Sequence, residues 1–206
     1  MMIKDFGGPV ATIWEDLRPV TKKLLERTLK TGKVTPVNSQ NTKHYYDAHA
    51  DWEVSRLLFA LDEQSKAADV RKDSAKLNEI EKLANTCVRV LEVQTASAEV
   101  FIQLATRALK DNDYDRLDKL ADLLSQRFSA GEIAEIVRQT EMPQIRAIAY
   151  ETLAMLPIYI ITPLLDDPLY AGIAANSLEQ KAYEFDSEEA KDLLDQFDAE
   201  NDIAGE

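Results

Sequence analysis

The chain is poor in cysteine, a residue that disulfide-rich secreted proteins contain in number. Its 206 residues include a single cysteine, Cys87, so an internal disulfide framework is excluded. Such cysteine usage is typical of a reducing compartment. Lys4 and Asp5 stand where a signal peptide needs an unbroken apolar stretch. We therefore expect a cytoplasmic protein.

Glycine is also scarce, and strand patterns are missing. Only six glycines occur, and alternating runs of β-branched and aromatic residues are absent, while apolar spacings of three and four recur. The sequence predicts an all-α fold of antiparallel helices, packed either as an irregular bundle or as a short HEAT-like solenoid.

No apolar run is long enough to span a bilayer. The longest uncharged stretch, residues 152–165, is interrupted by Pro157 and Pro163, whereas a spanning helix needs about 20 apolar residues. The net charge of −13 disfavours both anionic membranes and nucleic acids as partners. We expect neither partner and interpret residues 152–165 as a buried element.

The charge is uneven along the chain. Residues 1–43 carry a net charge of +4, residues 44–183 carry −8, and residues 184–206 carry −9. We predict an N-terminal helical segment and linker over 1–43, a helical-repeat-like domain over 44–198, and a disordered acidic tail over 199–206.

Local signals place helix ends. Pro19 should divide a helix over residues 12–30, and Gly32 should end it. A long periodic stretch over 74–110 should break near residues 94–97. The Ser129-x-x-Glu132 pattern predicts the start of a short helix.

Two segments 25 residues apart share a pattern. Both begin with proline, at Pro143 and Pro168, and both should open a helix there. The first resembles the helix-opening motif of HEAT-type repeats, which it matches at Pro143, Ile145, Arg146, Ala149 and Leu153. The second has Ala171 where arginine is expected, and the 25-residue spacing is short for a HEAT unit. Residues 104–124 also look like a tetratricopeptide-type helix pair. These resemblances imply stacked helices that bind another protein.

One window holds both histidines. His44, Asp47, His49 and Asp51 combine imidazole and carboxylate, the ligand set of zinc, iron or manganese. Neither a helix nor a strand would direct all four side chains to one side. The alternative is a polar linker that enters a helix, with Asp47 near its N-cap.

Catalytic motifs are absent, including Gly-x-Ser-x-Gly, a Gly-rich phosphate loop, Cys-x-x-Cys and Glu-x-x-His. We therefore expect a non-enzymatic protein-protein interaction module without a cofactor, with self-association as an open alternative. Exposed tyrosines on stacked helices would form its partner-binding face, namely Tyr150, Tyr159 and Tyr170. The same tyrosines could instead be half-buried core residues. A helical metal-binding protein or metalloenzyme is the second hypothesis, and a ligand-binding bundle with a pocket lined by residues 152–165 is the third.

Overall fold

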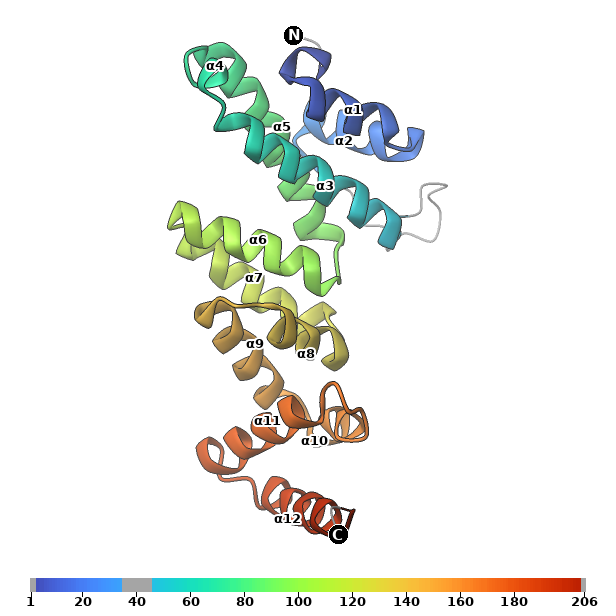
Figure 1. Cartoon of the computed structure of the whole chain (residues 1–206), viewed down its shortest axis with the longest axis vertical. Helices are drawn as coiled ribbons and strands as arrows, with labels where there is room; N and C mark the ends of the chain where they lie inside the picture. The colour runs from blue at the N-terminus through green and yellow to red at the C-terminus, as the bar shows by residue number, and fades with distance from the viewer. Residues whose placement is uncertain (1–2, 35–45, 205–206) are drawn as a thin grey trace. The chain divides into compact units, whose positions relative to one another are not determined.

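The computed structural model describes residues 3–34 and 46–204 (Figure 1). These residues form twelve α-helices and two 3-10 helices, and no strand occurs among them. The chain divides into two compact units, residues 1–95 (unit 1) and residues 96–206 (unit 2). The prediction of an all-α fold of packed helices is confirmed, and the arrangement is compatible with a helical repeat. The predicted domain bounds stay a prediction.

Unit 1 is built around two long helices. Its elements are η1 (Ile3–Phe6), α1 (Gly8–Asp16), α2 (Pro19–Thr31), α3 (Ala48–Ser65), α4 (Ala68–Arg71) and α5 (Ser74–Gln94). α3 packs along α5, α1 packs on α3, and α2 packs on α5. The apolar stripe of α3 supplies the centre of this core through Val54, Leu57, Leu58 and Leu61, all fully buried.

Local signals set the helix ends of unit 1, and those at Pro19 and Gly32 were predicted. Pro19 begins α2 at a position where its missing N–H costs nothing. Gly32 ends α2 with φ 67°, a left-handed conformation that glycine adopts without strain. Asp73 caps α5 by accepting hydrogen bonds from the amides of Ala75 and Lys76.

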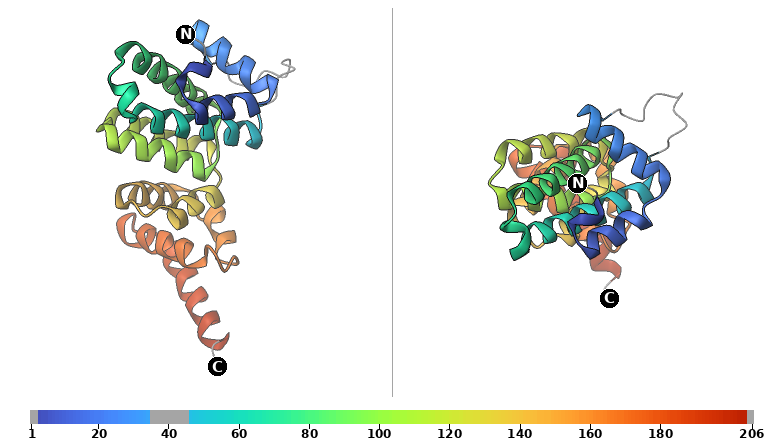
Figure 2. Two further views of the ribbon diagram at one scale, coloured as in Figure 1. Left: turned by 45° about the horizontal axis from the view of Figure 1, so that its top comes forward. Right: turned by 90° about the horizontal axis from the view of Figure 1, so that it is seen from above.

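Unit 2 is a succession of helix pairs. Its elements are α6 (Ala98–Asp111), α7 (Tyr114–Arg127), α8 (Ala130–Gln139), α9 (Pro143–Met155), α10 (Ile158–Ile161), η2 (Thr162–Leu164), α11 (Ala171–Glu184) and α12 (Glu188–Ala204). α6 packs on α7 and α8, α7 packs on α9, and α8 packs on α9. α11 then packs on α9, and α12 packs on α11, an order that Figures 1 and 2 show from different sides.

Caps and turns connect these pairs. The break between α5 and α6 occurs where it was predicted, over residues 95–97. Asn112 ends α6 with φ 55°, and Asp113 then caps α7 by accepting from the amide of Arg116. Ser129 caps α8 by accepting from the amide of Glu132, as predicted. Glu132 itself caps another helix, because its Oε2 accepts from the amide of Ala98 at 2.8 Å.

The second proline does not open a helix. Pro143 is at the start of α9 as predicted, but α11 begins at Ala171 rather than at Pro168. Asp167 explains the delay: its side chain accepts from the amide of Leu169, and its carbonyl accepts from the amides of Tyr170 and Ala171. These bonds hold residues 167–170 in turns before the helix starts. The repeated pattern therefore marks two different local structures.

The C-terminal helices share a small apolar cluster. Buried Ile161, Ala174, Leu178, Ala182 and Ala190 join α10, α11 and α12. Ile158 and Leu193 pack on this cluster from α10 and α12. The uncharged residues 152–165 contribute Ile161 to the core but leave Met155 and Tyr159 exposed, so the expectation of a buried element is correct only in part. Within the described ranges, no helix is both long and apolar enough to cross a membrane.

Candidate binding grooves

The predicted metal-ligand window begins outside the described residues, because His44 lies there. Asp47 is the N-cap of α3 and accepts from the amide of Ala50 at 2.8 Å. Its two carboxylate oxygens also accept from Arg18, at 3.0 Å from Nη1 and 2.7 Å from Nη2. The Arg18 guanidinium and the Ala50 amide hold the pKa of Asp47 far below its usual range. Asp47 thus anchors the start of α3 to the start of α2.

Asp51 faces the interior of unit 1. One oxygen accepts from the Tyr46 hydroxyl at 2.5 Å, and the other accepts from the Thr95 hydroxyl at 2.9 Å. Burial, together with the Asp51 carboxylate, raises the pKa of Tyr46 far above its usual value. Asp51 therefore joins three segments of unit 1 and has both oxygens engaged.

His49 lies on the outer side of α3. Its ring is 5.4 Å from the ring of Trp52, and its Nε2 is 3.9 Å from a carboxylate oxygen of Glu53. Over the described ranges 3–34 and 46–204, no three His, Cys, Asp or Glu side chains are grouped so that they could hold a metal ion. The structure therefore directs Asp47, His49 and Asp51 to different surroundings, and the metal-site hypothesis stays a prediction.

Glu53, which was not predicted as a site residue, is the more deeply buried of two buried carboxylates, Asp51 and Glu53, among the described residues of unit 1. It is 2% exposed and accepts from the amide of Arg18 at 2.6 Å, from Arg18 Nε at 3.0 Å, and from the Thr21 hydroxyl. Burial by itself would raise its pKa, but the bonds from Thr21 and Arg18 outweigh burial and lower the pKa. Glu53 thereby satisfies the free N-terminal end of α2 from a neighbouring helix. We interpret this network as structural.

The three predicted tyrosines have different surroundings. The Tyr170 hydroxyl donates to Glu135 at 3.0 Å and so connects α11 to α8. Arg138 donates to both oxygens of Glu135, and these bonds lower the pKa of Glu135 to about 2. Tyr159 is 75% exposed, and Tyr150 is half-buried. Tyr150 and Tyr159 each border a groove of unit 2.

The first groove, the α9–α11 groove, has a volume of about 560 Å³. It is lined by Ala147, Tyr150, Glu151, Asn176, Glu179, Gln180, Glu184 and Phe185. The helical period explains this lining, because residues 147, 150 and 151 share a face of α9, and residues 176, 179 and 180 share a face of α11. The groove combines two aromatic rings with three carboxylates.

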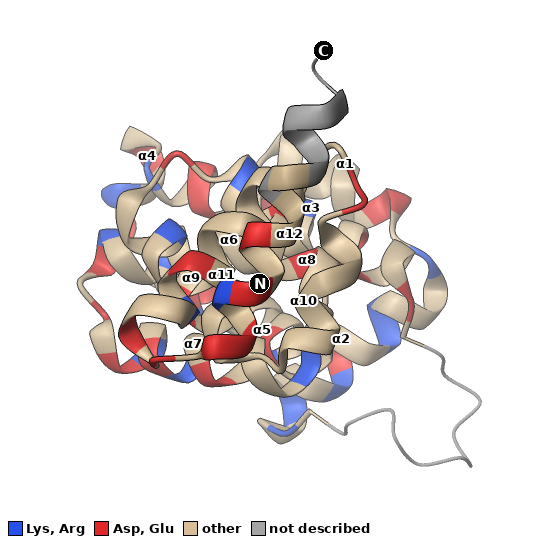
Figure 3. Cartoon of the chain, turned by 90° about the horizontal axis from the view of Figure 1, so that it is seen from below, with Lys and Arg blue, Asp and Glu red and all other residues tan. Residues whose placement is uncertain are grey.

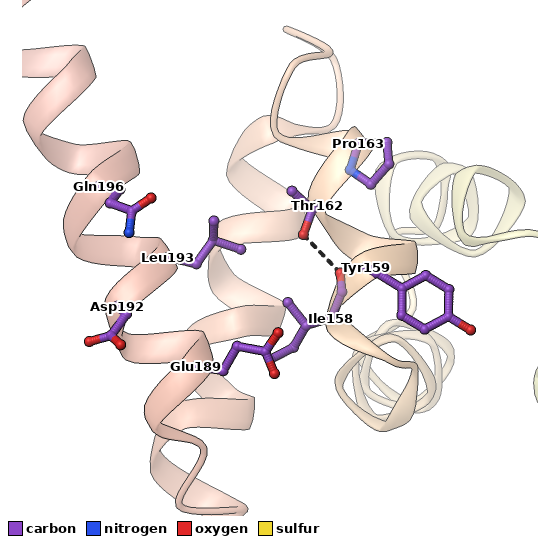
Figure 4. A pocket seen from close by; sticks show the side chains of 8 residues that line it. All are labelled: Ile158, Tyr159, Thr162, Pro163, Glu189, Asp192, Leu193 and Gln196. Carbon is purple, nitrogen blue, oxygen red and sulfur yellow. Dashed lines mark hydrogen bonds between the residues drawn. The ribbon is translucent and has the colours of Figure 1, made fainter.

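The second groove, the α10–α12 groove, has a volume of about 580 Å³. It is lined by Ile158, Tyr159, Thr162, Pro163, Glu189, Asp192, Leu193 and Gln196. Figure 4 shows Ile158, Thr162 and Leu193 facing one another between the two helices, while the Tyr159 ring points away from α12. Tyr159 is therefore at the outer edge of this groove. Residues 152–165 supply four of the lining residues, Ile158, Tyr159, Thr162 and Pro163, so this stretch borders a groove as the third hypothesis expects.

Both grooves are acidic, and so is the unit that contains them. Residues 1–95 carry a net charge of +1, whereas residues 96–206 carry −14. Asp and Glu are coloured red and Lys and Arg blue in Figure 3. As far as the described chain extends, no lysine or arginine lines either groove. The nearby Lys181 is engaged, because its ammonium group donates to the carbonyls of Ala154 and Leu156 at the end of α9.

Carboxylates of the α9–α11 groove lack counter-charges. Glu151 and Glu179 form no ion pair with any described residue, and Glu184 accepts only from the uncharged Gln180 side chain. One residue of this groove was predicted from the sequence, since Tyr150 was a partner-binding candidate. The acidic side chains were missed because α9 and α11 come together by packing across the intervening segment, which contains α10 and η2.

Comparison with protein-family models, with curated proteins and with solved structures finds no match for this chain.

Proposed function

We propose that the protein is a non-enzymatic protein-protein interaction module, in which unit 2 binds a basic segment of another protein in the α9–α11 groove. The uncompensated Glu151 and Glu179 carboxylates beside Tyr150 and Phe185 are the observation that carries this proposal. A lysine or arginine of the partner would neutralise carboxylates that have no cation of their own. Apolar or aromatic partner side chains would cover the two rings.

The stacked helices suit this role. The pairs α6–α7 and α8–α9 pack on neighbouring helices, as in repeat proteins, which bind partners on the surface of the stack. We propose further that the stack is of the HEAT-like type suggested by the segment around Pro143. Ile145, Ala149 and Leu153 of that segment are buried, and Arg146 donates to the carbonyl of Thr140. These contacts support a repeat-type helix.

A peptide-display selection on the purified full-length chain tests the proposal. We expect selected peptides to be enriched in Lys or Arg together with aliphatic or aromatic residues. Their affinity should fall at least about tenfold, or about 1.4 kcal/mol, in the double variant Glu151→Lys, Glu179→Lys. Phe185→Ala should weaken the same peptides, because Phe185 is half exposed beside the carboxylates.

The matched control is Asp118→Lys, Asp122→Lys. It makes the same charge change on exposed positions of α7, outside both grooves. If the control weakens the peptides as much as the groove variant does, then the overall charge binds them and not the groove. If selection returns no basic peptides, the proposal is wrong.

A further inference from the structure

A separate surface on unit 1 carries exposed aromatic side chains on one face of α3. His49, Trp52, Arg56 and Phe59, here called the α3 stripe, follow one another at i, i+3, i+7 and i+10, so they lie along a single line of the helix. Trp52 is 52% exposed and Phe59 is 62% exposed. The opposite face of α3 holds the buried Val54, Leu57, Leu58 and Leu61, so the stripe is not part of that core.

The composition of the α3 stripe differs from an ordinary solvated helix face. Single exposed apolar residues are common on protein surfaces. Here, however, two large aromatic rings are two helical turns apart, and an arginine lies between them. Tryptophan, arginine and phenylalanine are enriched in the buried centres of protein interfaces. The α3 stripe therefore has the composition of an interface that lacks its partner.

The charge of the α3 stripe indicates what would cover it. The Arg56 guanidinium is 5.2 Å from the centre of the Trp52 ring, within the range of a cation–π interaction. No acidic side chain among the described residues forms an ion pair with Arg56. Its donors are thus pre-positioned over an aromatic ring and available to a carboxylate, which arginine binds in a bidentate geometry.

We propose that the α3 stripe docks an acidic amphipathic helix of another protein. An acidic side chain of that helix would bind Arg56, and apolar side chains on either side would cover Trp52 and Phe59. This surface is chemically opposite to the α9–α11 groove, which takes a basic segment, and it belongs to the other unit. The inference does not depend on the proposed function of the groove.

Two synthetic peptides of about 18 residues, long enough to form a helix, test this inference on the full-length chain. Both have leucine and phenylalanine on one helical face; the remaining positions are glutamate in one peptide and lysine in the other. We expect the glutamate peptide to bind by calorimetry and the variant Arg56→Glu to weaken it at least about tenfold. Arg71→Glu makes the same charge change on the exposed surface of α4, and it should leave the affinity within about twofold.

Fluorescence locates the binding. The chain has two tryptophans, Trp14 and Trp52, so the variant Trp14→Phe leaves Trp52 as the single indole reporter. The glutamate peptide should shift Trp52 emission to shorter wavelength as it covers the ring. Absence of binding to the wild-type chain, binding that survives Arg56→Glu, or binding without a change in Trp52 emission would each overturn the inference. The groove proposal fails on a different result, namely lysine-rich binding that is insensitive to Glu151→Lys, Glu179→Lys.

Discussion

At the scale of single residues, three carboxylates connect helices that are distant in the sequence. Glu53 accepts hydrogen bonds at the start of α2, Glu132 accepts one at the start of α6, and Glu135 accepts one from Tyr170, which directly precedes α11. Each of these bonds comes from the beginning of a helix other than the carboxylate's own. Such contacts could not be predicted from the sequence, because partners separated by about 35 positions leave no local pattern.

Glu53→Gln should lower the free energy of unfolding by about 2 kcal/mol, because the neutral amide leaves the Arg18 and Thr21 donors poorly matched in a buried site. Urea unfolding measures the change. Glu63→Gln is the control, since Glu63 is on the same helix with an exposed side chain, and it should stay within about 0.5 kcal/mol of the wild type. Equal effects of the two substitutions would contradict the structural importance of Glu53.

Glu135 should titrate at about pH 2 in a carbon-detected NMR experiment, because Arg138 donates to both of its oxygens. In Arg138→Gln its pKa should rise toward the ordinary value of about 4.3. Since the folded-state pKa is lowered, the contribution of Glu135 to stability is complete above about pH 4.3 and is lost as the pH falls toward 2. An unchanged titration in Arg138→Gln would show that the ion pair does not form in solution.

At the scale of helices, the ends were predicted best where one residue decides them. Pro19, Gly32, Ser129 and Pro143 act through their own backbone or side-chain chemistry, and the structure has helix ends at each. The prediction of a helix start at Pro168 was wrong because Asp167 accepts hydrogen bonds from the following amides and holds them in turns instead. Helical spacing puts Trp52 and Phe59 on the side of α3 opposite Val54, Leu57, Leu58 and Leu61, but it does not tell whether another helix covers that second side.

Ser129→Ala should lower the free energy of unfolding by about 1 kcal/mol, because the amide of Glu132 loses its side-chain acceptor at the start of α8. Thermal or urea unfolding measures the loss. Ser125→Ala is the matched control: Ser125 is exposed within α7, where alanine is the better helix former. If both substitutions are neutral, Ser129 does not cap α8 in solution.

At the scale of the whole chain, the negative charge is concentrated in one of the two units. By sequence segment the negative charge is shared between residues 44–183 (−8) and 184–206 (−9), whereas the division after Thr95 assigns −14 to unit 2 and +1 to unit 1. That division depends on which helices pack together, and the local periodicity of the sequence does not predict packing between distant segments. Fold class was therefore predictable, whereas the two units and the grooves were not.

Because the two units differ in net charge, salt should change their stability by different amounts. Net charge of one sign destabilises a compact state by self-repulsion, and salt screens it, since the Debye length falls from about 10 Å at 0.1 M to about 3 Å at 1 M. Raising sodium chloride from low to molar concentration should therefore increase hydrogen-exchange protection in α6 to α12, while protection in α1 to α5 changes little. Because both units are measured in one sample, unit 1 serves as the internal control for nonspecific effects of salt. An equal gain in both units would show that the acidic excess of unit 2 does not limit its stability.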